Sequence, residues 1–241
     1  MNRIVISNGN WGTGSTRDIH RLLVNVASHI ERWLDCKSEY KILVQNAAPE
    51  VAPRILYRTN QSGPITILLS TRERRWDQYS YQFAHEFCHL VSDYENLRKQ
   101  QKQWFQEVLC ELASLFVLKQ MAAEWRTNPP YSNWDSYAPS LQTYAHNAIL
   151  AAGPAPTSGK FGNWYRINQL RTNPYNRQLN CLVATALLPF IELQPRLLNG
   201  VTNLPDSDSC FLDFLRQWRA RCVSNSDAFV ERVIELFEMA D

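Results

Sequence analysis

The pattern of apolar and polar positions divides the chain into a first part that mixes strands with helices and a second part that is mainly helical. Four short runs rich in Ile, Leu and Val have the length of strands, and turn residues such as Pro53, Gly63 and Pro64 separate them. These runs cover residues 4–6, 40–44, 54–58 and 65–70. They predict a small twisted sheet.

A first helix is predicted over residues 16–34, because its apolar residues recur every three or four positions. Ser15 precedes it as an N-cap, and Asp18 follows three residues later, as in a capping box. The glycines just before Ser15 give the stretch some likeness to a phosphate-binding loop. The required lysine and the GxGxxG spacing are both missing, so nucleotide binding is not predicted.

Two further helices are predicted near residues 76–93 and 104–118. The first has a polar stripe opposite an apolar stripe. Its polar residues are Gln78, Gln82, His85, Glu86, His89 and Asp93. From Val108 to Leu118 only Glu111 and Ser114 are strongly polar, so the second helix is predicted to be buried on nearly all sides.

Residues 126–130, with two prolines, break the helical pattern and mark a predicted boundary between subdomains 1–125 and 126–241. The second subdomain is predicted to be mostly helical. Its expected helices lie near 139–152, 164–172, 175–193, 209–220 and 226–239. The predicted fold class is therefore α+β, with a small sheet packed on the helix near 76–93.

His85, Glu86 and His89 form the pattern HExxH on that helix. Residues four apart share a helix face, so the two histidines can offer their ring nitrogens to one metal ion. Glu86 lies about 100° round the helix from His85, near enough to hydrogen-bond a water at an open coordination position. The pattern predicts two metal ligands and a base on one face.

Glu107 and Glu111 lie four apart on the predicted buried helix, where an unpaired carboxylate costs several kcal/mol. Glu107 would complete a set of two histidines and one carboxylate, which leaves a fourth position for water. Glu111 would accept the second ring N–H of a ligand histidine. Glu95 is an alternative third ligand, although it follows His89 closely and has polar surroundings.

Other roles for these residues remain open at this stage. Glu107 and Glu111 would instead be surface acids if they faced solvent or lysines, of which Lys102 and Lys119 are the nearest candidates. Cys88 and Cys110 flank the metal-facing stripes, and we assign them to packing because two histidines and one glutamate already suffice as ligands.

The segments HEFCHLVSDY and QEVLCELAS resemble the gluzincin metallopeptidases. Their local sequence is closest to the thermolysin-like branch. The resemblance covers about residues 76–118, and the gap of seventeen residues between His89 and Glu107 is close to the family's spacing. It implies that Zn²⁺ is bound by His85, His89 and Glu107, with Glu86 as general base. It also implies that Glu111 orients His85 and Gln106 orients His89.

The same resemblance implies a zincin-like fold and a peptide substrate. The last strand, at about 65–70, would be the sheet edge along which an extended peptide aligns its backbone. Gluzincins also supply a His or Tyr that donates to the developing oxyanion from the helical half. The resemblance ranks Tyr175 first and His146 second, and Tyr144 and Tyr165 are further candidates.

Charge and cysteine content exclude some other classes. The chain has 25 basic and 23 acidic residues and no polybasic run, so no nucleic-acid partner is expected. The apolar run at 4–6 is too short for a signal-peptide core or a membrane span. The six cysteines lack CxxC spacing, and we expect reduced thiols in a cytoplasmic protein.

The sequence thus predicts a zinc metallopeptidase. The alternative is a zincin-like sensor or protein-binding module, in which the metal site is structural or has been lost. Nothing in the sequence indicates the oligomeric state.

Overall fold

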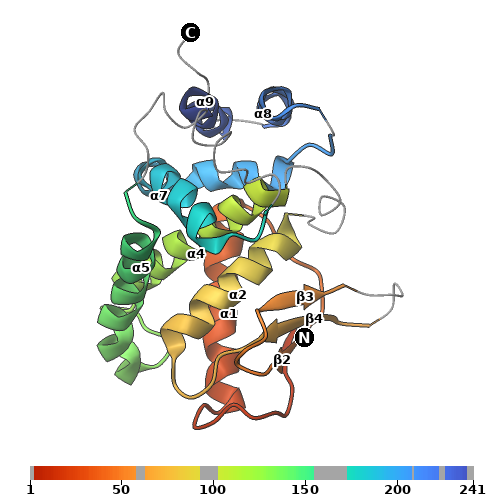
Figure 1. Ribbon diagram of the computed structural model, residues 1–241. Helices are drawn as coiled ribbons and strands as arrows, with labels where there is room; N and C mark the ends of the chain where they lie inside the picture. Colours follow the sequence, from red (N-terminus) through yellow and green to blue (C-terminus); the bar gives the residue numbers. More distant parts are fainter. Residues whose placement is uncertain are drawn as a thin grey trace.

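A mixed four-stranded sheet packs beside a larger helical body (Figure 1). The computed structural model describes residues 3–57, 63–92, 103–154, 173–207, 209–222 and 226–237. The strands are β1 (Ile4–Ile6), β2 (Ile42–Asn46), β3 (Arg54–Leu56) and β4 (Ile65–Leu69), in the order β1-β2-β4-β3. β1, β2 and β4 are parallel, and β3 pairs with β4 in the antiparallel direction. The α+β class is confirmed.

The expectation that the strand at 65–70 forms the sheet edge was wrong. β4 lies between β2 and β3, and the edge on that side is β3. Ile65, Ile67 and Leu69 are buried, as suits a strand with neighbours on both sides. β3 has only three residues, follows Pro53 and begins with the exposed Arg54, which are features typical of a protected edge.

Three long helices form the centre of the molecule (Figure 1). They are α1 (Thr16–Leu34), α2 (Trp76–Val91) and α4 (Gln103–Glu124). Ser15 caps α1 as predicted, since its side chain accepts a hydrogen bond from the backbone N–H of Asp18. α2 packs against both α1 and α4, and every residue of α4 from Trp104 to Leu118 is buried.

The α2 helix is also fixed to the sheet. The Gln82 side chain accepts a hydrogen bond from the backbone N–H of Ser70, just after β4, and donates one to the Ser70 hydroxyl. Gln82 lies one turn before Glu86 on the same face of α2. This pair of hydrogen bonds therefore sets the position of the HExxH segment relative to the sheet.

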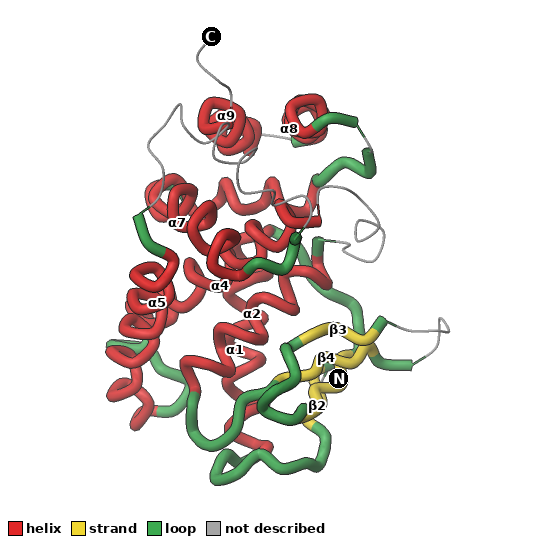
Figure 2. Tube along the Cα trace, viewed as in Figure 1, coloured by secondary structure: helices red, strands yellow, loops and turns green. Residues whose placement is uncertain are grey.

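Helices dominate the second half of the chain (Figure 2). They are η1 (Ser132–Tyr137), α5 (Ala138–Ala152), α7 (Arg177–Leu193), η2 (Pro195–Asn203), α8 (Phe211–Arg221) and α9 (Ser226–Phe237). Four of the five predicted helices are confirmed, and the one near 164–172 lies outside the described residues. α5 and α7 pack against α4, and one continuous hydrophobic core includes residues from both sides of the 126–130 break.

Two general features of the chain complete the fold. All six cysteines are free thiols. Among the described residues, no helix has both the length and the apolar content needed to cross a membrane.

A buried histidine in α1 gives a prediction about acid stability. The His29 side chain is 1% exposed, and burial lowers its pKa from 6.5 to about 4 although Glu124, whose carboxylate lies 3.6 Å away, opposes the change. The unfolded chain takes up this proton near pH 6.5 and the folded chain only near pH 4. Stability is therefore lost as the pH falls through this interval.

We expect wild-type protein to lose about 2 kcal/mol of unfolding free energy through His29 between pH 7 and pH 5. The variant His29→Leu should lose less stability over the same interval by about this amount. Urea unfolding of both proteins at the two pH values measures the difference. Equal losses in the two proteins would contradict this account of His29.

Candidate metal centre

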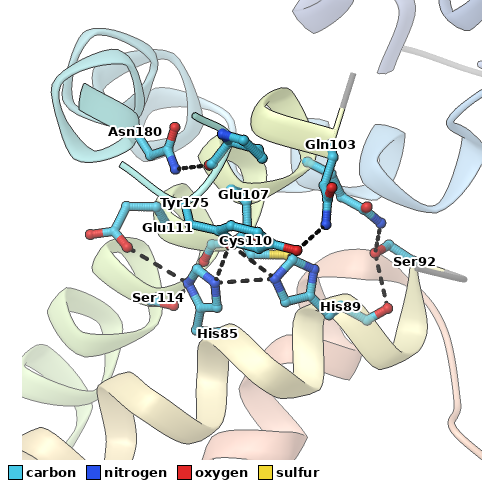
Figure 3. Close-up of polar contacts among 12 residues, drawn as sticks. His85, His89, Ser92, Gln103, Glu107, Cys110, Glu111, Ser114, Tyr175 and Asn180 are labelled. Carbon is cyan, nitrogen blue, oxygen red and sulfur yellow. Dashed lines mark hydrogen bonds and ion pairs between the residues drawn. The ribbon is translucent and has the colours of Figure 1, made fainter. Parts of the chain in front are cut away.

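Two helices bring three potential metal ligands together in one cluster (Figure 3). Nε2 of His85 lies 3.0 Å from Oε2 of Glu107 and 3.1 Å from Nε2 of His89. Nε2 of His89 lies 3.4 Å from the same Glu107 oxygen. The histidines come from α2 and the glutamate from α4, so the close packing of these helices creates the cluster.

The size of this triangle suits a small divalent ion. A tetrahedral ion with bonds of about 2.0–2.1 Å keeps its ligand atoms about 3.3–3.4 Å apart. The three measured sides, 3.0, 3.1 and 3.4 Å, lie at or slightly below that spacing. The residues present therefore fit a metal ion with three protein ligands.

The electrostatics of the cluster favour a bound positive charge. Burial disfavours the charged form of His85, but the adjacent carboxylates of Glu107 and Glu111 outweigh it and raise the pKa of His85 above its usual range. Burial likewise acts against ionised Glu107, yet the adjacent His89 and His85 hold the pKa of this carboxyl below its usual range. The Glu107 carboxylate is thus held in the ionised form, which is the form that binds a metal ion.

Glu86 differs from Glu107 in its electrostatic surroundings. Burial raises the pKa of its carboxyl group, while the two neighbouring histidines and the backbone N–H of Ile55 on β3 oppose the rise. Glu86 is 7% exposed and lines the same pocket as the three candidate ligands. A carboxylate whose proton affinity is raised by burial is suited to accept a proton from a nearby water.

The structure brings Glu111 to the position expected for a partner of His85. Its Oε2 lies 3.6 Å from Nδ1 of His85, on the side of the ring away from Glu107. The Tyr81 hydroxyl donates a hydrogen bond to the other oxygen of Glu111. Because Glu111 occupies Nδ1, Nε2 of His85 is the nitrogen left for a metal.

The structure links Gln106 to the main chain of His89 through Ser92. The Gln106 amide donates to the Ser92 hydroxyl, and Ser92 in turn donates to the backbone carbonyl of His89, so Gln106 acts on the main chain. The ring Nδ1 of His89 instead lies 3.2 Å from Sγ of Cys110. Cys110, for which the sequence predicts a packing role, therefore lies beside the second ring nitrogen of this histidine.

The structure bears on the alternative in which Glu107 and Glu111 are surface acids that face solvent or lysines. Lys119 pairs with Glu192 of α7, and neither Glu107 nor Glu111 faces solvent. Glu95 and Lys102 lie outside the described residues.

The candidate oxyanion donors lie in different places. Tyr175 lines the pocket, is largely exposed, and accepts a hydrogen bond of 2.5 Å from the Gln103 side chain (Figure 3). His146 is exposed on α5 and does not line the pocket, so the structure does not support it as a donor. Tyr144 packs against Tyr81. Tyr165 lies outside the described residues.

A pocket of about 730 Å³ surrounds the cluster. Its wall combines β3 residues with parts of α2, α4 and the start of α7, so residues distant in sequence meet there. The pocket also contains Arg177, which was not singled out from the sequence. Arg177 is two residues after Tyr175, and only the packing of α7 on α4 brings it to the site.

Comparisons of the chain with protein-family models, with curated proteins and with solved structures find no match.

The contact between Cys110 and His89 predicts an effect on metal binding. Partners of a ligand histidine typically contribute tenfold to a hundredfold in metal affinity. Cys110→Ala should therefore weaken Zn²⁺ binding about tenfold, measured by competition with a chelator. Cys110→Ser is the matched control, because its hydroxyl still accepts a hydrogen bond, and it should bind within about threefold of wild type. Unchanged affinity in Cys110→Ala would show that the thiol only fills space.

Proposed function

We propose that the protein is a zinc-dependent metallopeptidase of the gluzincin type with a zincin-like fold. The observation that carries the proposal is the close approach of His85, His89 and Glu107, with Glu86 in the same pocket. Two nitrogens and one carboxylate oxygen are the donor set of hydrolytic zinc sites that keep an open position. The small sheet beside the HExxH helix supports the zincin-like fold.

Each residue of the site has a distinct role in the proposed reaction. His85, His89 and Glu107 would hold zinc, which when bound acts as a Lewis acid and lowers the pKa of water. The Glu86 carboxylate accepts a proton from the attacking water and delivers it to the nitrogen of the leaving amine. Glu111 keeps His85 in the required tautomer.

The pocket supports a peptide as substrate. Its volume of about 730 Å³ is large enough for several side chains, and the edge strand β3 forms part of its wall. Tyr175, two residues before α7, is the candidate donor to the developing oxyanion, because it lines this pocket and carries a hydroxyl group. Its hydrogen bond to Gln103 would have to yield to the substrate.

The role of Glu86 gives the first test of the proposal. Glu86→Gln removes the base but no metal ligand, so the variant should keep stoichiometric zinc and lose cleavage of a peptide library by about 10²- to 10⁴-fold. Zinc is measured by elemental analysis and cleavage by mass spectrometry. Glu50→Gln, an exposed glutamate outside the pocket, is the matched control. Full activity in Glu86→Gln would refute the assignment of the base.

The role of Glu107 gives an independent test that needs no substrate. Glu107→Gln keeps the shape of the side chain and removes the charged ligand, so zinc should be lost at chelator concentrations that leave wild type loaded. Glu192→Gln on the surface of α7 is the control for the same chemical change. Equal zinc retention in the two variants would exclude Glu107 as a ligand. Zinc bound without any peptide cleavage by wild type would favour the sensor or binding module.

A further inference from the structure

A second charged feature of the pocket is the guanidinium of Arg177, the first residue of α7. The same pocket contains the candidate metal centre, and Arg177 remains accessible to solvent. Within the part of the chain that the structure describes, no carboxylate oxygen lies within 4.0 Å of the guanidinium. The pocket therefore contains a fixed cation that is not paired directly with any of the described acids.

Tyrosines hold this cation in place. The guanidinium carbon lies 4.6 Å from the centroid of the Tyr81 ring, and Tyr144 packs against the same ring. Both tyrosine hydroxyls are neutral at ordinary pH, because burial raises the pKa of each. A guanidinium has five N–H donors, so donors remain for a further acceptor. Neutral partners orient the group without cancelling its charge.

The nearest acid is already engaged by other groups. Glu111 accepts the Tyr81 hydroxyl at one oxygen, and its other oxygen lies 3.6 Å from Nδ1 of His85. These contacts also show that Arg177 lies close to the candidate metal centre. Tyr81 and Glu111 connect Arg177 to His85. A group bound at Arg177 would thus lie within one or two residues of a peptide bond held at the metal centre.

We propose that Arg177 binds a carboxylate of the peptide substrate. This proposal rests on the proposed peptidase function and specifies its substrate class. A guanidinium matches a carboxylate with two parallel hydrogen bonds, and the N-terminus of α7 adds positive potential at the same place. Glu86 and Glu107 repel an anion beside the HExxH segment, so they favour its binding on the Arg177 side of the pocket.

The carboxylate has two chemical sources, the C-terminus of the peptide or an acidic side chain. Three peptides of one sequence separate them. One has a free C-terminal acid and an internal Gln, the second has a C-terminal amide and the same Gln, and the third has the amide and Glu in place of Gln. Binding is measured by calorimetry to the zinc-loaded Glu86→Gln protein, so the result does not depend on turnover, and kcat/KM is measured with zinc-loaded wild type.

Arg177→Gln should weaken binding of the carboxylate-bearing peptide about tenfold to a hundredfold, and the peptide without a carboxylate less than threefold. Arg177→Lys should recover part of the loss, because lysine restores the positive charge but cannot form the two parallel hydrogen bonds of a guanidinium. Arg196→Gln removes an exposed arginine that does not line the pocket and is the matched control, with no selective effect expected. Zinc content and unfolding temperature are recorded for each variant, so that damage to the Glu111 region is recognised.

The outcome assigns or rejects the role of Arg177. Selective loss for the free acid assigns the C-terminal carboxylate, and selective loss for the Glu peptide assigns the side chain. Equal effects on all three peptides would overturn the proposal, because Arg177 would then act on a neutral group or on the fold. Failure of wild type to cleave any peptide would refute the peptidase function, while the binding comparison would still decide whether a carboxylate is recognised.

Discussion

The central constraint on this structure is the burial of two carboxylates in a mostly apolar stretch of helix. Glu107 and Glu111 lie in the stretch of α4 that is buried throughout, between α2 on one side and α5 and α7 on the other. Isolated carboxylates in such surroundings cost several kcal/mol each. Here His85 and His89 lie opposite them, so α2 and α4 can pack together only if positive charge, from a proton or a metal ion, is shared between them.

The surroundings separate the roles of three glutamates that lie close together. Adjacent imidazoles lower the pKa of Glu107 and Glu111, whereas burial dominates at Glu86 and raises its pKa. Glu107 and Glu111 are therefore held in the ionised form, as a metal ligand and its supporting partner require. Glu86 instead takes up a proton more readily. Such divergence between neighbouring acids of one type is a physical basis for assigning acid-base roles.

Much of the site could be predicted because it depends on local periodicity. The four-residue spacings of His85 with His89 and of Glu107 with Glu111 place each pair on one helix face, and the apolar pattern around Glu107 indicates burial. The boundaries of α1 and its cap at Ser15 also followed from local signals. These features need no knowledge of which elements pack together.

The features that were missed depend on long-range packing. Whether Gln106 or Cys110 meets the ring of His89 is decided by how α4 packs against α2, because these two positions lie about 40° apart around the helix and one turn apart along it. Arg177 follows Glu107 by seventy residues and reaches the pocket only because α7 packs on α4. The edge position of β3 was missed for the same reason, since strand order is set by pairing between distant segments. In hindsight, Pro53 and Arg54 were the local signals for an edge.

The proposed function depends on an ion at the point where His85, His89 and Glu107 converge. Its most direct test is anomalous diffraction at the zinc absorption edge from crystals of the wild-type protein equilibrated with Zn²⁺. We predict one strong peak about 2.0–2.2 Å from Nε2 of both histidines and from a Glu107 oxygen. A protein that binds no zinc, or a peak at another place such as the thiols of Cys88 and Cys110, would contradict it.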